Sequence, residues 1–141
     1  MKKTTVFLFC VVLLFSCNEK KPLECTKSVA NISGPYRVTA YGYKQTPTSP
    51  EEDYYPIIFP DACDRDDIYT FKTNGTYEMK DAGLVCSPPD DETGVWTYDG
   101  NAMTIDGYPA ALESFDCKTL IISTADINIA GDKLKITMIK Q

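Results

Sequence analysis

Apolar and polar residues alternate in short runs along most of this chain, and turn residues separate the runs. Runs of this kind, with a period of two, are typical of half-buried β-strands. No long stretch shows apolar residues at helical spacing. The pattern therefore predicts an all-β protein built from sequential hairpins.

The first predicted hairpin turns at residues 73–75, and two registers are open to it. A three-residue loop places Phe71 opposite Tyr77 and Tyr69 opposite Met79, with all four apolar side chains on one face. A two-residue loop would turn half of them to the other face. We therefore predict the three-residue loop, with its glycine in the left-handed conformation as a bulge.

Two further hairpins are predicted at Asp99-Gly100 and Gly131-Asp132, each with a two-residue loop. In the second hairpin this loop pairs Trp96 with Met103. In the third hairpin the predicted pairs are Ile129 with Leu134, Ile127 with Ile136, and Ala125 with Met138.

Three more segments complete the pattern. Residues 36–44 and 119–123 are predicted strands, and the second of these is either buried on both faces or changes register near its end. Residues 109–115 are predicted to form a short helical turn that starts at Pro109. The sum is a seven- to eight-stranded antiparallel up-and-down barrel, because closure covers the apolar face and removes exposed edges. A β-sandwich is the alternative.

Residues 1–16 are typical of an export signal and not of a folded element. Lys2 and Lys3 precede an apolar run at residues 6–15. A membrane-spanning helix needs about twenty apolar residues, roughly twice this length. We therefore predict a cleaved signal peptide.

The end of this run, Leu14-Phe15-Ser16-Cys17, resembles the lipobox of bacterial lipoproteins. The resemblance implies that Cys17 becomes the first mature residue and carries a diacylglycerol and a further acyl chain. Each buried methylene group contributes about 0.8 kcal/mol to holding such a protein at a bilayer. We expect an outer-membrane-anchored protein of the cell envelope. An ordinary cleaved signal with Cys17 unlipidated is the alternative.

Composition excludes several functions. The 141 residues include 14 Lys and Arg against 20 Asp and Glu, and the formal net charge is -6. This balance argues against a nucleic-acid-binding protein, which needs a basic face for the phosphates. The absence of histidine excludes Ser-His-Asp and Cys-His catalysis and the commonest zinc sites. Because phosphate-binding glycine loops and G-x-S-x-G are also missing, we expect no enzyme.

Four cysteines follow the lipobox, and an exported chain is expected to join them in two disulfides with three possible connectivities. Extending the register of the first hairpin brings Cys63 one residue from alignment with Cys86, and a bulge at Gly83 removes the difference. We therefore predict Cys63–Cys86, which leaves Cys25–Cys117. A metal site with four thiolates is the alternative, but the cysteine spacing does not fit one.

The connection between the first strand and Cys63 has about twenty residues, too many for a plain hairpin. Long loops in compact domains are usually functional or disordered. Its apolar part offers five candidate contact residues: Tyr54, Tyr55, Ile57, Ile58 and Phe59. One interpretation is a lid or contact surface at the barrel mouth. The other is that the segment folds over one end of the barrel and completes the core.

Acidic residues flank Cys63 and Cys86, and the predicted disulfide would gather them at one end of the barrel. They are Asp61, Asp64, Asp66, Asp67, Asp90, Asp91 and Glu92. Oxygen-rich clusters can bind Ca2+, and the candidate metal ligands are Asp64, Asp66, Asp67, Asp90 and Asp91. The EF-hand spacing is missing, however, and acidic loops are usually solvated. Their negative potential also favours a basic partner.

Several motifs together resemble the lipocalin-like domain of exported bacterial lipoproteins. They are Gly34-Pro35-Tyr36-Arg37-Val38, Cys63-Asp64-Arg65-Asp66-Asp67-Ile68-Tyr69-Thr70-Phe71, Asn74-Gly75-Thr76-Tyr77, Cys86, Gly94-Val95-Trp96 and Asn101-Ala102-Met103-Thr104-Ile105. The resemblance covers most of residues 34–139 and implies a small barrel without catalytic residues. We divide the chain into a signal peptide (1–16), a lipidated tether (17–33) and a barrel domain (34–141).

Two functions stay open at this point. The first is binding of a small apolar or aromatic ligand inside the barrel, because its predicted interior positions are Tyr, Phe, Trp and Met. An eight-stranded barrel has room for side chains or for one small ligand. The second is a non-catalytic protein-interaction module, such as an envelope inhibitor or accessory subunit, that uses the 54–60 loop and the acidic end. The sequence leaves the ligand and the oligomeric state open.

Overall fold

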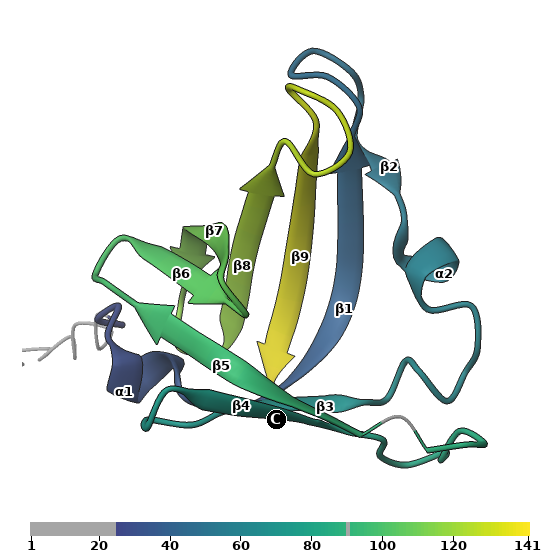
Figure 1. Ribbon diagram of the computed structural model, residues 1–141, viewed down its shortest axis with the longest axis vertical. Helices are drawn as coiled ribbons and strands as arrows, with labels where there is room; N and C mark the ends of the chain where they lie inside the picture. Colours follow the sequence, from purple (N-terminus) through teal and green to yellow (C-terminus); the bar gives the residue numbers. More distant parts are fainter. Residues whose placement is uncertain (1–24, 90) are drawn as a thin grey trace, which may run out of the picture.

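The structure, a computed structural model, describes residues 25–89 and 91–141. These residues form two single-turn helices and nine strands (Figure 1). The helices are α1 (Val29–Ile32) and α2 (Tyr55–Ile58), and the strands are β1 (Gly34–Lys44), β2 (Glu52–Asp53), β3 (Ile68–Phe71), β4 (Thr76–Lys80), β5 (Glu92–Tyr98), β6 (Ala102–Ile105), β7 (Tyr108–Phe115), β8 (Thr119–Ala125) and β9 (Lys133–Lys140). Within the described ranges, neither helix has the length and apolar character needed to cross a membrane.

Eight strands close into one antiparallel ring. From β3 to β9 each strand pairs with the next along the chain, and β1 pairs with both β3 and β9. The short β2 pairs with Gly42 and Tyr43 near the end of β1, whereas β3 pairs with the first three residues of β1. The predicted up-and-down barrel is confirmed, because a single closed sheet excludes the sandwich.

The β3–β4 hairpin has the predicted register. Phe71 pairs with Tyr77, and Tyr69 pairs with Met79. Gly75 has a φ of 85°, in the left-handed region that the bulge requires. The side chains of Phe71, Tyr77 and Met79 are all buried, so the hydrophobic pattern selected the correct loop.

The register predicted for the β5–β6 hairpin is wrong by two residues. Met103 pairs with Tyr98 and not with Trp96, which pairs with Ile105. The Asp99 carboxylate accepts hydrogen bonds of 2.9 and 2.8 Å from two backbone N–H groups of the turn, which lengthens the loop. A shift of two residues keeps every side chain on its predicted face, and Trp96 is buried as expected.

The register predicted for the third hairpin is also wrong. Ile136 pairs with Ile122 and Met138 pairs with Leu120, so none of the three predicted pairs forms. The strand predicted at 119–123 exists as β8 and ends at Ala125. A long loop therefore replaces the predicted two-residue turn.

The buried carboxylate of Asp132 explains this loop. It accepts hydrogen bonds of 2.7–3.2 Å from the backbone N–H groups of Ile127, Asn128 and Ile129, and one of 2.9 Å from the Tyr43 hydroxyl. A short side chain that ends in a carboxylate can accept neighbouring backbone N–H groups, and these groups are then not available to the β-ladder. The two isoleucines are consequently exposed in a loop and do not belong to a strand.

Residues 109–115, predicted as a helical turn, lie in β7 instead. Ala110 and Leu112 are buried with a period of two, and the register with β8 shifts directly after Leu112. This bulge turns Phe115 inward as well. Pro109, which suggests a helix start in the sequence, lies instead in β7 and pairs with Thr104 of β6.

Helix α1 closes one end of the barrel. The Ser28 hydroxyl caps it, and Ile32 is fully buried. The Tyr36 hydroxyl donates a 2.7 Å hydrogen bond to the carbonyl of Ile32. The rings of Tyr36 and Trp96 both lie edge-on to Phe71, with centroids 5.9 and 5.2 Å away. Aromatic packing therefore fills this base of the barrel.

Residues 25–33, assigned to the tether from the sequence, are part of this closed base. The disulfide Cys25–Cys117 joins the start of the described chain to the turn between β7 and β8. The signal peptide, Cys17 and the rest of the tether up to residue 24 lie outside the described residues.

Candidate binding cavity and acidic cluster

A cavity of about 130 Å3 lies inside the barrel. Its lining is aromatic and aliphatic: Val38, Tyr41, Tyr69, Phe71, Tyr77, Ile105, Ile122, Ile136 and Met138. These residues come from six different strands, and the period of two along each strand brings their side chains to the interior. The buried Trp96 and Met103 do not line it. The cavity therefore lies apart from these two buried side chains at the base of the barrel.

The cavity contains three tyrosines, which differ in their hydrogen bonding. Tyr77 donates its hydroxyl to Asp106 Oδ2 over 2.5 Å. Burial raises the pKa of Tyr41. Burial also raises the pKa of Tyr69, and the nearby Tyr41 phenol adds to that increase. No hydrogen bond within the described residues contributes to either shift. Two neutral phenol groups are thus available as hydrogen-bond donors inside an apolar space.

The segment 54–60 closes a gap in the barrel wall. β1 pairs with β3 only over its first three residues, which leaves the following part of this β1 edge without a strand partner. The backbone N–H of Tyr54 donates to the carbonyl of Tyr41, and the Tyr55 hydroxyl donates to that of Val38, at 2.8 and 3.2 Å. The segment therefore covers the edge of β1 and substitutes for a strand there.

The five residues proposed as a contact surface divide into two groups. Phe59 is buried, with its ring centroid 5.5 Å from that of Tyr41, and Tyr54 and Tyr55 are half-buried against the barrel. Ile57 and Ile58, by contrast, are 64% and 46% exposed on α2. The core-completing interpretation describes the three aromatic residues, and only the two isoleucines are free to contact a partner.

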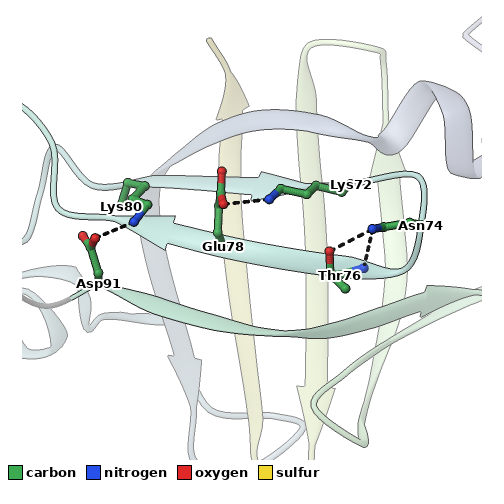
Figure 2. Close-up of polar contacts among 6 residues, drawn as sticks. All are labelled: Lys72, Asn74, Thr76, Glu78, Lys80 and Asp91. Carbon is green, nitrogen blue, oxygen red and sulfur yellow. Dashed lines mark hydrogen bonds and ion pairs between the residues drawn. The ribbon is translucent and has the colours of Figure 1, made fainter.

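The acidic residues also divide. Asp64, Asp66 and Asp67 lie near the Cys63–Cys86 disulfide, whereas Asp91 pairs with Lys80 at 2.5 Å (Figure 2). Asp90 lies outside the described residues.

Sequence reasoning missed Asp81. Its Oδ2 atom accepts a 2.8 Å hydrogen bond from the backbone N–H of Cys86. The β3–β4 register pairs Ile68 with Lys80, so residues just before β3 and just after β4 are neighbours. That register was the signal that places Asp81 beside Asp67.

The environment of Asp67 is unusual for a carboxyl group. Its side chain is only 6% exposed. The pKa of Asp67 is raised to about 6, chiefly by burial. A hydrogen bond from the Ala82 backbone N–H lowers the pKa in part, and the carboxylates of Asp81, Asp64 and Asp66 raise it. Several negatively charged carboxylates therefore lie near one another, and that of Asp67 is largely shielded from water.

The structure contains both disulfides that the sequence predicted, Cys25–Cys117 and Cys63–Cys86. The second is not built across an extended ladder, because β3 begins at Ile68 and β4 ends at Lys80. It joins two loops instead. Asp64 Oδ1 lies 3.1 Å from the Cys86 sulfur, and since an oxidised sulfur has no hydrogen this is a contact and not a hydrogen bond.

The outer face of the β3–β4 hairpin has ordinary surface chemistry. Lys72 pairs with Glu78 at 2.7 Å, and Asn74 Oδ1 accepts hydrogen bonds from the backbone N–H and hydroxyl of Thr76 (Figure 2). Exposed ion pairs of this kind contribute about 0.2–1 kcal/mol each. These contacts stabilise the turn and define no site.

The family model of the lipocalin-like domain matches residues 32–136 of this chain. Comparison with curated proteins gives no match to this chain. The matched region runs from the last residue of α1 into β9 and so includes almost all of the closed barrel and its cavity. The chain belongs to the lipocalin-like domain family.

Proposed function

We propose that this protein is a binding protein, and that it holds one small aromatic or apolar molecule with a hydrogen-bond acceptor in the barrel cavity. The observation behind the proposal is an apolar space of about 130 Å3 with two unengaged tyrosine hydroxyls among the described residues. A buried cavity of about 150 Å3 with apolar walls is known to bind benzene. The preferred ligand is therefore about the size of one substituted ring.

The lining also defines the charge of the ligand. In the part of the chain that the structure describes, no Lys or Arg lines the cavity, so an anion would lose its hydration without gaining a partner. Because burial raises the pKa of Tyr41 and Tyr69, both phenols stay neutral well above physiological pH. They favour a neutral ligand with a carbonyl or similar acceptor. Among the described residues, no Ser, Thr, Cys or Lys lines the cavity, and the Tyr77 hydroxyl is engaged by Asp106. The proposal is therefore binding without turnover.

Two probes of closely similar shape test this proposal: acetophenone, which has a carbonyl acceptor, and α-methylstyrene, in which a methylene group replaces the carbonyl oxygen. We expect acetophenone to bind about tenfold more tightly, the effect of one hydrogen bond of about 1–1.5 kcal/mol. Tyr69→Phe should reduce this preference by removing one donor while keeping the ring. Calorimetric titration measures all four affinities.

Ile136→Phe, which fills the cavity, should abolish binding of both probes. Ile129→Phe is the matched control, because Ile129 lies in the exposed 126–132 loop. The proposal fails if neither probe binds the wild-type protein, or if Ile136→Phe binds them as the wild type does. Native mass spectrometry of protein purified from its own envelope then searches for the natural ligand.

The proposal includes a lipid anchor on Cys17 at the outer membrane. The signal-like residues 1–16 support it, and so do two disulfides, which persist in oxidising compartments. The described chain begins next to the base closed by α1 (Figure 1). Cys17→Ser should release the protein from the membrane fraction, with loss of the acyl mass from its N-terminus. Unchanged fractionation would contradict the anchor.

A second candidate function rests on the exposed isoleucines of α2. Ile57 and Ile58 present apolar surface, while the buried Phe59 holds the segment in place. This arrangement fits the contact patch of a protein-interaction module. Replacing both isoleucines with serine should reduce cross-linking to an envelope partner in cells. The same change at the exposed Ile127 and Ile129 is the control, and equal loss in both variants would reject α2 as the contact.

A further inference from the structure

Three aspartates hold the segment 81–86 by one carboxylate oxygen each. Asp66 Oδ2 accepts a 2.8 Å hydrogen bond from the backbone N–H of Leu84. Asp81 Oδ2 accepts one from Cys86, and Asp67 accepts one from Ala82. The segment therefore curls around three carboxylates beside the disulfide.

The second oxygen of each carboxylate has no partner. Oδ1 of Asp66, Asp67 and Asp81 is buried, and none of the three finds a hydrogen-bond partner among the described residues. A carboxylate carries about four acceptor positions, and leaving a buried charged group partly unsatisfied is unfavourable. These three oxygens lie on the two loops that the disulfide joins, and a positive charge between the loops would compensate them.

Among the described residues, no lysine or arginine forms an ion pair with these aspartates. The Arg65 guanidinium donates instead to the carbonyls of Phe59 and Pro60, at 2.9 and 3.0 Å. Lys80 is engaged by Asp91, on the outer face of the hairpin. Each described ion pair of the protein lies elsewhere and involves none of Asp64, Asp66, Asp67 or Asp81.

We propose that Asp64, Asp66, Asp67 and Asp81, here called the acidic cluster, bind one calcium ion beside the Cys63–Cys86 disulfide. Ca2+ prefers several carboxylate oxygens at 2.3–2.6 Å and accepts irregular geometry, whereas Mg2+ demands a near-ideal octahedron. A thiolate metal such as Zn2+ does not fit, because both nearby sulfurs are oxidised.

Calcium binding requires the acidic cluster to contract. Among the described residues, no three carboxylates have oxygens within 4.8 Å of one another, and the one group of that compactness contains the two bridged cysteines and Asp64. The carboxylates come from two loops that the disulfide already joins. An ion would thus draw the free oxygens together within a preformed frame.

Calorimetric titration of the whole protein, first stripped with EDTA, tests the proposal with CaCl2 as the probe. We expect one saturable site per chain, with a rise in the thermal unfolding midpoint that MgCl2 and NaCl at equal ionic strength do not reproduce. Asp67→Asn keeps the acceptor for the Ala82 N–H but removes the charge, and it should weaken Ca2+ binding at least tenfold. It should also unfold at a higher temperature than the wild type in EDTA.

The matched control is Asp61→Asn, which removes one negative charge from the same loop. Asp61 is exposed and is not among the groups that shift Asp67, so this variant should bind Ca2+ as the wild type does. Should Asp67→Asn fail to fold, Asp81→Asn serves the same purpose.

Three results would overturn the proposal. One is the absence of saturable Ca2+ binding to the wild-type protein. Another is equal weakening by Asp61→Asn and Asp67→Asn, which would mean diffuse attraction only. The last is stabilisation by acid alone with no response to Ca2+, in which case the occupant is a proton. None of these depends on the ligand of the barrel cavity.

Discussion

The Tyr43 hydroxyl donates a 2.9 Å hydrogen bond to the buried carboxylate of Asp132, and this contact ties β1 to the loop 126–132. The same carboxylate accepts three backbone N–H groups of that loop. We expect Asp132→Ala to lower the thermal midpoint by several degrees, because it leaves these donors unsatisfied. Tyr43→Phe removes one of the four hydrogen bonds and should have a smaller effect. Equal thermal midpoints of both variants and the wild type would contradict the role of Asp132 in holding this loop.

Asp132 should also make stability depend on acid pH. Burial opposes its charge, but the hydrogen bonds from residues 127–129 and from Tyr43 outweigh it and hold the pKa of Asp132 below the usual value. A carboxyl group with a lowered pKa stabilises the fold above its unfolded pKa of about 3.9, and this stabilisation is lost as pH falls through the folded pKa. Thermal melts between pH 2 and 5 should show a weaker acid dependence in Asp132→Ala than in the wild type.

Asp67 should have the opposite effect in calcium-free buffer. Its pKa is raised to about 6, chiefly by burial. Between about pH 4 and pH 6 the native state then binds more protons than the unfolded state, so stability falls as pH rises through this range. Asp67→Asn should flatten that part of the curve, measured by urea unfolding. A wild-type curve that rises between pH 4 and 7 as steeply as in the variant would contradict the raised pKa.

Phe59 should matter for stability, and its neighbour Ile57 should not. Phe59→Ala removes a buried ring that packs on Tyr41, and such truncations cost about 3–5 kcal/mol. Ile57→Ala changes an exposed side chain and should stay within about 0.5 kcal/mol of the wild type. Urea unfolding measures both differences. Equal effects would mean that the 54–60 segment is not docked as described.

The two disulfides should differ in their contribution to stability. Cys25–Cys117 closes a sequence separation of 92 residues, and Cys63–Cys86 closes one of 23. In the chain-entropy model their removal costs about 4.6 and about 3.4 kcal/mol. We therefore expect the paired serine replacement of Cys25 and Cys117 to lower the free energy of unfolding more. The reverse order would show that loop closure is not the main effect.

The three hairpins show which features of a hairpin the hydrophobic pattern predicts and which it does not. In β3–β4 the Asn74 side chain accepts the backbone N–H of Thr76 within a turn of the predicted length, and the hydrophobic pattern selected the correct register. In β5–β6 and β8–β9 the carboxylates of Asp99 and Asp132 bind backbone N–H groups and lengthen the loops. The hydrophobic pattern does not register such contacts, so both predictions failed at the turns and not in the strands.

The candidate site shows the same division. Interior positions such as Tyr69 and Phe71 followed from alternation alone, and they do line the cavity. Whether a cavity exists depends on how side chains from six strands meet, and a pattern along one strand does not contain that information. Asp81 differs, because the predicted register of β3 with β4 already places it beside Asp67. Only the structure shows its hydrogen bond to the backbone N–H of Cys86.

The sequence by itself determined the all-β class, the antiparallel order of sequential hairpins and the closed barrel. These features follow from period-two burial and from the need to cover one apolar face and its edges, which are local or additive requirements. Only the tertiary structure decided the lengths of two loops, the volume left inside the barrel and the meeting of the buried aspartates. Each of these depends on groups that are distant along the chain and become neighbours only when the ring closes.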